Sequence, residues 1–191
     1  DNYQNGCNGN YGISTPTEVA LPVGRTAEAV ATGHRHTCAI MDDQSVWCWG
    51  QNNDGQLGVG NYSSGSWGYS PNQVLMPSGV NATAISLGSY HTCVVVEDGR
   101  AFCWGFNVDG SVGDGTAGTD RNVPTQVSGT TSYVSISSGN NHNCAITTTA
   151  TVQCWGDNFK QQIGLGFYTP SDQTTPQDTA LPVGAEVSSL A

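Results

Sequence analysis

The chain has 191 residues, a length that fits one domain or a segment of a larger one. It holds 5 Lys and Arg against 15 Asp and Glu, a net charge of −10, and so few cations argue against nucleic-acid binding. No apolar run reaches the roughly 18 residues of a membrane span, while 37% hydrophobic residues suffice for a core and 25 Gly predict many turns.

Residues 1–32 are predicted to hold the end of a preceding repeat and a lead-in strand. Residues 1–3 match residues 157–159, which directly follow a Cys-Trp-Gly, so the chain is expected to begin just after a missing copy of that motif. Residues 187–191 match residues 84–87, so the chain is also expected to end inside a repeat. Such ends would leave strand edges open, which predicts a longer chain or completion by a neighbouring chain.

Residues 33–87 form the first complete repeat. Residues 33–40 and 46–50 predict two short strands joined by an acidic turn. A Gly-rich turn, a variable loop, a segment around Pro71 and a closing strand at 84–87 follow. Each period thus holds about four short β segments, and nowhere does a 3.6-residue periodicity predict a helix.

Two further copies cover residues 88–138 and 139–191, and all copies belong to one propeller-type domain. Each copy repeats a pair of Cys ten residues apart, a Cys-Trp-Gly and a Pro, at spacings between 51 and 55 residues. Such a period with strand-like content predicts an all-β fold of propeller blades, each with four short antiparallel strands. The chain would supply about three and two-thirds repeats of roughly 52 residues, as part of a larger or chain-completed propeller.

The paired Cys are predicted to form disulfides across each hairpin. The hairpin midpoints fall at Asp43, Asp98 and Thr149, so a three-residue loop would place each Cys opposite its partner, near disulfide reach. The predicted disulfides are Cys38–Cys48, Cys93–Cys103 and Cys144–Cys154. Buried, reduced Cys are the alternative. Disulfides persist in oxidising compartments, so we expect an extracellular or cell-surface protein.

Cys7 is left without a partner in this pattern. It matches Leu57 and Ile163, which are apolar positions, so one interpretation is a buried free thiol. The other is a bond to a Cys outside this segment or in another chain.

The recurring polar residues allow several interpretations. Each His-x-Cys, as in His36 and Cys38, puts two zinc-capable ligands on one strand face, but each Cys has a better partner and no metal is expected. Each His is expected instead to fix the turn before its strand through the backbone. Asn52, Asn107 and Asn158 are expected to tie turns to the backbone, since a calcium loop would need a different acidic spacing. The repeated Trp is expected to pack between units.

Catalytic motifs are missing from the sequence. It contains no Gly-x-Ser-x-Gly, no His-Glu-x-x-His and no phosphate-binding loop. We therefore expect no catalytic residue, no cofactor and no enzymatic activity.

Two variable loops, 61–69 and 166–170, are rich in aromatic, small and polar residues. Such loops on a rigid scaffold resemble a binding rim, with local packing or subunit contact as the alternative. The candidate binding residues are Tyr62, Trp67, Tyr69, Phe167 and Tyr168. Asn61 and Asn81 begin Asn-x-Ser/Thr sequons and are candidate glycosylation sites.

The unit Gly-x-x-His-Thr-Cys, followed by Cys-Trp-Gly-x-Asn-x-x-Gly-Gln-Leu-Gly, resembles the repeat of the regulator of chromosome condensation family over essentially the whole chain. The match is loosest in the third copy, where Gln161 replaces a Gly. The resemblance implies four-stranded blades around an axis, usually seven, of which this chain would supply about half. Its members include a nuclear exchange factor, ubiquitin-ligase domains and secreted inhibitors, so function does not transfer with the fold. Because paired Cys are not part of the minimal motif, the chain looks like an extracellular branch.

The function expected from these features is that of a non-enzymatic extracellular scaffold that assembles through blade edges, as in a filament or surface layer. The alternative is a secreted binding module that presents its aromatic loops to a protein or glycan. The expected partners are accordingly a second copy, another protein or a glycan, and not nucleic acid.

Overall fold

The computed structural model describes residues 16–182, 185 and 187–190. This described part contains β-strands and no helix, and hence no helix that could cross a membrane. The strands are β1 (Ala27–Thr32), β2 (His36–Met41), β3 (Val46–Asn52), β4 (Ser63–Gln73), β5 (Ala82–Leu87), β6 (His91–Val96), β7 (Ala101–Gly105), β8 (Arg121–Gln126), β9 (Tyr133–Ser138), β10 (His142–Thr147), β11 (Val152–Gly156) and β12 (Gln173–Asp178).

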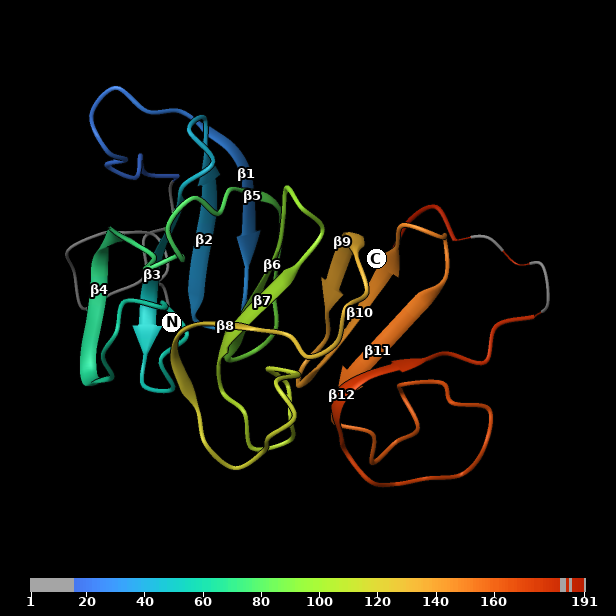
Figure 1. Ribbon diagram of the computed structural model, residues 1–191. Coiled ribbons are helices and arrows are strands. Elements are labelled where there is room, and N and C mark those ends of the chain that lie inside the picture. Colours follow the sequence, from blue (N-terminus) through green and yellow to red (C-terminus); the bar gives the residue numbers. More distant parts are fainter. Residues whose placement is uncertain (1–15, 183–184, 186, 191) are drawn as a thin grey trace.

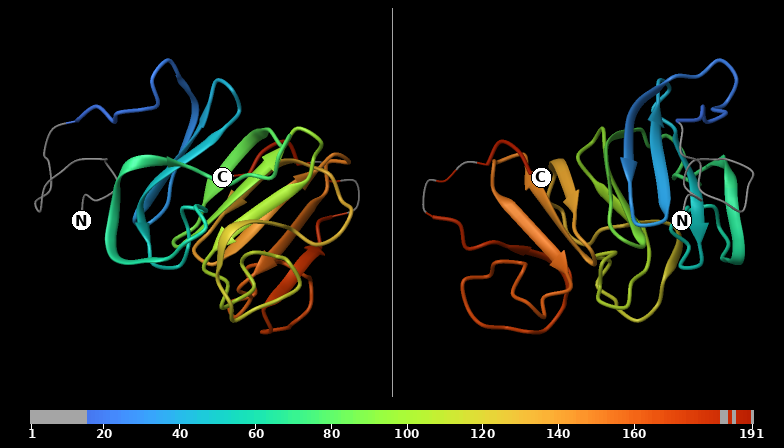
Figure 2. Two further views of the ribbon diagram at one scale, coloured as in Figure 1. Left: turned by 60° about the vertical axis from the view of Figure 1, so that its left-hand side comes forward. Right: turned by 180° about the vertical axis from the view of Figure 1, so that it is seen from behind.

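The strands form three antiparallel sheets of four consecutive strands each (Figure 1). Their orders are β1-β2-β3-β4, β5-β6-β7-β8 and β12-β11-β10-β9, and we call them blades 1, 2 and 3. The first strand of blade 2, β5, contacts both β1 and β9, so the first strands gather at the inside of the fan of sheets (Figure 2). The fourth strands, β4, β8 and β12, form the outer edges. The predicted all-β blade architecture is confirmed.

The sheets and the sequence repeats are out of phase by one strand. The repeat at 33–87 begins at the turn before β2 and ends with β5, which is already the inner strand of blade 2. Each repeat therefore belongs to two blades, so the chain itself links neighbouring sheets at the inner edge.

The core lies between the blades. All six residues of β2 and all six of β6 are buried, because the two faces of a central strand meet different neighbours. On β6, Val94 faces the cluster shared with blade 1 and Cys93 faces the cluster shared with blade 3. Strict alternation of apolar and polar residues is therefore not seen in these strands, as expected for strands covered on both sides.

The recurring Pro residues lie in the outer strands. Pro71 is in β4, Pro124 in β8 and Pro176 in β12, and each lies where the pairing with the neighbouring strand is interrupted. Pro cannot donate to a ladder, so it is tolerated there and makes the outer edge a poor template for another strand.

The structure contains the three disulfides that the spacing predicts. The two Cys of each pair are direct cross-strand partners, with Cα atoms 4.1, 4.2 and 4.1 Å apart. The hairpin loops have the predicted three residues, and their last residue has a positive φ: Gln44, Gly99 and Ala150. Cys7 lies outside the described residues.

Candidate binding face

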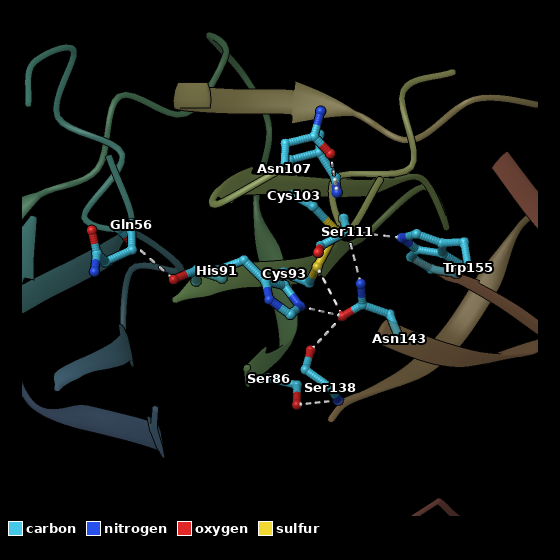
Figure 3. Close-up of a disulfide and its surroundings, with 12 residues drawn as sticks. Gln56, Ser86, His91, Cys93, Cys103, Asn107, Ser111, Ser138, Asn143 and Trp155 are labelled. Atoms are coloured by element: carbon cyan, nitrogen blue, oxygen red, sulfur yellow. Dashed lines mark hydrogen bonds between the residues drawn. A yellow bond between two sulfur atoms is a disulfide. The ribbon is translucent and has the colours of Figure 1, made fainter. Parts of the chain in front are cut away.

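The blades are joined by buried polar side chains, shown for blades 2 and 3 in Figure 3. His91 is fully buried, and its Nε2 lies 2.9 Å from Oδ1 of Asn143 on blade 3. Asn143 Nδ2 donates to the carbonyl oxygen of Ser111 on blade 2 (2.8 Å), and Trp155 Nε1 donates to the same oxygen (3.1 Å). The amide of Asn143 thus lies between two groups of blade 2, which fixes how blade 3 docks.

The junction between blades 1 and 2 repeats this arrangement with a different acceptor. His36 Nε2 lies 2.9 Å from Oγ1 of Thr92, which donates to the carbonyl oxygen of Gln56 at 2.9 Å. Trp104 Nε1 donates to that same oxygen at 2.9 Å. Since the Thr92 hydroxyl proton is used on Gln56, its oxygen accepts from His36, which places a proton on Nε2 of the imidazole.

The expected role of His was therefore wrong for His36 and His91. Their Nε2 atoms do not bond the backbone of their own turn but reach a side chain of the next blade. The reason is the Gly three residues earlier: a Cβ on Gly88 would lie within 2.7 Å of the Gly139 carbonyl and against the His91 ring. Gly leaves this space to the imidazole, which can extend across the junction.

Burial keeps these imidazoles neutral. It lowers the pKa of His36 to about 3, with a further contribution from His91. Burial also lowers the pKa of His91 to about 4, against the opposing effect of its bond to Asn143. In both cases the neutral ring serves as a hydrogen-bond donor within the junction.

The repeated Gly, His and Cys-Trp-Gly residues, together with the side chains that join the blades, are called the frame below. The frame holds variable side chains at one face of the blades. Between the Gly and the His of each turn lie two residues that differ from blade to blade, and a third follows each Cys-Trp-Gly. The backbone joins them in the same way each time: the amide of Phe106 donates to the carbonyl of Tyr90 (2.9 Å), and Asp157 and Gln51 donate to their equivalents. Because these turns join β1 to β2, β5 to β6 and β9 to β10, they lie at the same end of the blades as the long loops.

Five of these residues form a continuous surface that we call the axial strip: His34, Tyr90, Phe106, Asn140 and Asn141. His34 Nδ1 lies 3.0 Å from the Tyr90 hydroxyl, and their rings meet edge to face at 5.5 Å. The rings of Tyr90 and Phe106 are 6.4 Å apart. Ser89 connects this aromatic part to blade 3 through a hydrogen bond to Asn140.

The blade 3 end of the axial strip is acidic. Asn141 Nδ2 donates to Asp109 Oδ2 at 2.9 Å. Burial raises the pKa of Asp109, and the nearby carboxylates of Asp172 and Asp157 raise it further. The strip therefore runs from His34 through two aromatic rings to a region of negative potential.

The predicted loop residues have different outcomes. Tyr62 is 51% exposed, and its hydroxyl donates to the Asp120 carbonyl on blade 2 at 3.0 Å, so it also links two blades. Phe167 and Tyr168 are 68% and 81% exposed in the loop between β11 and β12. Trp67 and Tyr69 lie in β4 and not in a loop, because residues 63–73 pair with β3.

The Asn of each Gly-rich turn has its predicted role. Asn107 Oδ1 accepts the amide of Val112 at 2.9 Å, and Asn52 and Asn158 accept from Leu57 and Ile163. Among the described residues no group of three His, Cys, Asp or Glu is placed to hold a metal.

The axial strip was not found from the sequence. The candidate binding residues chosen from the sequence include neither His34, Tyr90 nor Phe106. The available signal was the variation itself: within a strongly repeated motif, these positions change character from copy to copy.

The sequence matches a model of the regulator of chromosome condensation (RCC1) repeat at residues 43–95 and 98–146, and a second model of the same repeat at 28–56, 82–111 and 133–162. The chain belongs to this repeat family. The RCC1 domain-containing mitochondrial protein RUG3 of Arabidopsis thaliana is 32% identical to it over 174 residues, which cover 90% of the chain but 38% of RUG3.

Solved RCC1 structures share the fold. Human WBSCR16 superposes with a TM-score of 0.80 at 19% identity, over 91% of this chain and 45% of that one. Yeast RCC1 (Prp20), solved bound to Kap60, gives 0.74 at 23% identity, over 83% and 38%. The chain therefore spans less than half the length of these RCC1 proteins.

Proposed function

We propose that this chain is a protein-binding RCC1 propeller module that acts without catalysis in an oxidising compartment, and that the axial strip is its contact surface. The observation that carries the proposal is that the side chains of the axial strip differ from one copy of the repeat to the next, while the frame that holds them is repeated. The frame residues are buried in the junctions, whereas the strip residues vary while keeping one backbone geometry. Aromatic side chains beside polar ones are typical of interface hot spots.

The binding role is also supported by a relative. The yeast propeller of the same fold was solved bound to Kap60, a separate protein. Loops and turns on a rigid blade scaffold offer a pre-organised surface, so little conformational entropy is lost on binding. His36 and His91 fit this proposal, because they are buried donors with strongly lowered pKa values that hold the junctions together and do not face solvent as an acid or base.

Export is inferred from the disulfides. Three of them staple the hairpins of all three blades, and such bonds are rare in reducing compartments. Intact mass of the natural protein, with and without reductant, measures them directly: three bridges add about 6 Da on reduction. No change in mass would contradict export.

Site-specific photo-crosslinking tests the contact surface. A photo-crosslinking amino acid replaces Tyr90, and the protein is irradiated in its natural medium. A matched variant carries the same amino acid in place of Val123, an exposed residue of the outer strand β8. We expect a discrete protein adduct from position 90 that is absent from position 123. Loss of the adduct in the presence of free glycans would instead indicate a sugar ligand, and equal labelling at both positions would contradict the proposal.

A scaffold that assembles through blade faces is the second candidate. Gly113 of blade 2 lies against the Trp155 ring of blade 3, but no atom of the described residues would lie within 4 Å of a Cβ on the equivalent Gly164 of blade 3. His142, the equivalent of His36 and His91, is only half-buried. Blade 3 thus presents the same kind of docking face to a further blade. Fibres in electron micrographs that disappear in Gly164→Arg would support this role, and a monomer at all concentrations would exclude it.

A further inference from the structure

The two sequons differ in whether the side-chain nitrogen of their Asn is hydrogen-bonded in the folded protein. Asn61-Tyr62-Ser63 lies between β3 and β4, and Asn81-Ala82-Thr83 runs into β5. An N-linked sugar is attached to Asn Nδ2, and the sequon requires a hydroxyl two residues later. A folded glycoprotein must therefore leave that nitrogen in solvent.

Asn61 meets this condition. Its side chain is exposed, and its Oδ1 accepts from Asn52 Nδ2 at 3.1 Å and from the Ser63 hydroxyl at 3.3 Å. Asn52 is itself buried and held by the amide of Leu57. These two bonds engage Oδ1 and leave the nitrogen that would carry the sugar unengaged. Among the described residues no hydrogen bond involves this nitrogen.

Asn81 does not meet it. Its Nδ2 donates to Glu97 Oε2 at 2.6 Å, and its carbonyl accepts the Glu97 amide at 3.0 Å. The Thr83 hydroxyl donates to the Val95 carbonyl at 3.2 Å, and Ala82 between them is 2% exposed. Both ends of this sequon are thus engaged with β6 and the turn that follows it, and the nitrogen that would carry a sugar is held against the Glu97 carboxylate.

We propose that Asn61 carries an N-linked glycan and that Asn81 does not; this rests on the proposed export. The donor is a lipid-diphosphate-linked oligosaccharide. Nδ2 forms a bond to the anomeric carbon of its first sugar, the bond from that carbon to the diphosphate oxygen breaks, and the lipid diphosphate leaves with the electron pair. Nδ2 gives up one of its two protons to a base. Both hydrogen bonds to Oδ1 remain.

The glycan would cover the outer rim where blades 1 and 2 meet. Tyr62, the residue after Asn61, already reaches blade 2 there through its bond to Asp120. The parts of the face on blades 2 and 3, with Tyr90, Phe106 and Asn141, would remain open, which confines a protein partner to that side.

The experiment compares matched hydroxyl deletions. The whole chain is expressed behind a signal peptide in eukaryotic cells, and the intact mass is measured before and after peptide N-glycosidase. We expect one glycan on the wild type and on Thr83→Ala, and none on Ser63→Ala, while Ser63→Thr restores it. A glycan that persists in Ser63→Ala and is lost in Thr83→Ala would overturn the assignment.

Failure of export can be told apart from failure of the site. The mass is measured on secreted and on lumenal chain, together with the three disulfides. Oxidised chain without a glycan at Asn61 overturns the site alone. Removal of the sugar in ¹⁸O-labelled water marks the modified residue, since the enzyme converts glycosylated Asn to labelled Asp, and a label at residue 81 would equally overturn the proposal.

Discussion

At the scale of single residues, the buried polar groups at the blade junctions show the closest link between sequence and structure. His91 and Asn143 are both fully buried, yet each finds a partner in the neighbouring blade. An unpaired polar group costs more there than a paired one contributes, so these bonds act mainly against wrong docking. Thr92 and Asn143 occupy equivalent positions in blades 2 and 3. Each accepts a hydrogen bond from the imidazole of the preceding blade and donates one to a carbonyl of that blade, so the junction does not require one particular side chain.

Replacing this acceptor gives the first prediction. Asn143→Ala should lower the free energy of unfolding by about 2–3 kcal/mol, because His91 and the Ser111 carbonyl lose their partner in a buried site. Asn143→Thr, which copies blade 2, should lose less than half of that. Urea unfolding measures both, with the exposed Asn140→Ala as control. Equal losses in the two Asn143 variants would contradict the equivalence of the junctions.

The buried imidazoles predict a dependence of stability on pH. His36 and His91 have folded pKa values of about 3 and about 4, below the 6.5 of an unfolded His, so the unfolded chain binds more protons as pH falls. Stability should thus be full above pH 6.5 and decline toward pH 4, by up to about 1.4 kcal/mol per pH unit for each site. His91→Gln should reduce that slope by one site, measured as the melting temperature from pH 7.5 to 4.5.

The comparison with wild type is needed because Asp54 and Asp109 act in the opposite sense. Their pKa values are raised by burial and by neighbouring carboxylates, so they favour the folded state as they take up protons. An unchanged slope in His91→Gln would contradict this prediction, since it would show that this imidazole contributes nothing to the pH dependence of stability.

At the scale of the element, the hairpin between the two central strands of each blade is determined locally. The Cys pair, the three-residue loop and the positive φ of its last residue are all set within about a dozen residues. A disulfide closing such a short loop restricts the unfolded chain and adds about 2–3 kcal/mol in the chain-entropy model. Local determination explains why the hairpins were predicted so well.

The loop residue with positive φ gives the prediction for this scale. Gly99 suits its φ of 85°, whereas Ala150 adopts 60° at the cost of left-handed strain. Ala150→Gly should therefore stabilise the protein by roughly 0.5–1 kcal/mol after the greater backbone freedom of Gly is subtracted.

The matched change in blade 2 should act in the opposite direction. A Cβ on Gly99 would lie 2.7 Å from the Ser132 Cβ, so Gly99→Ala combines backbone strain with steric overlap. The change should lower the free energy of unfolding by roughly 1 kcal/mol or more. Thermal unfolding of both variants measures the pair. Stabilisation by both changes would show that the turn conformation is not the deciding factor.

At the scale of the whole molecule, the blades depend on their neighbours. The cores lie in the junctions, so blade 2 shares one apolar cluster with blade 1 and another with blade 3. In repeat architectures of this kind, stability is approximately a sum of nearest-neighbour terms. A change at one junction should then loosen one blade first.

Trp155 tests this organisation. It is fully buried, and both its ring and its Nε1 contact blade 2. Trp155→Ala should cost about 3–5 kcal/mol and expose the amides of β9 to β12 to hydrogen exchange, while the junction between blades 1 and 2 stays protected. Trp104→Ala, in the junction between blades 1 and 2, should instead loosen that junction first. Uniform loss of protection in Trp155→Ala would indicate a single cooperative core.

Predictions from the sequence were accurate where the cause is local and repeated. Turn chemistry around Asn107 and pairing of Cys93 with Cys103 follow from residues close in the chain, and three copies made them visible. The first part of the strand at 63–73 was assigned to a variable loop, because an outer edge strand such as β4 needs no apolar alternation and its Gly-rich sequence resembles a loop. The partner of His91 was missed because it lies 52 residues away.

The repeat, the all-β blades and the disulfides can be derived from the amino-acid sequence, since they depend on spacing and on short-range geometry. The contacts between blades become visible in the folded chain alone: which side chain accepts from each imidazole, and how His34, Tyr90 and Phe106 come together. The physical reason is the docking of neighbouring sheets. It brings equivalent positions about one period apart into contact, and a one-dimensional pattern does not show which faces will meet.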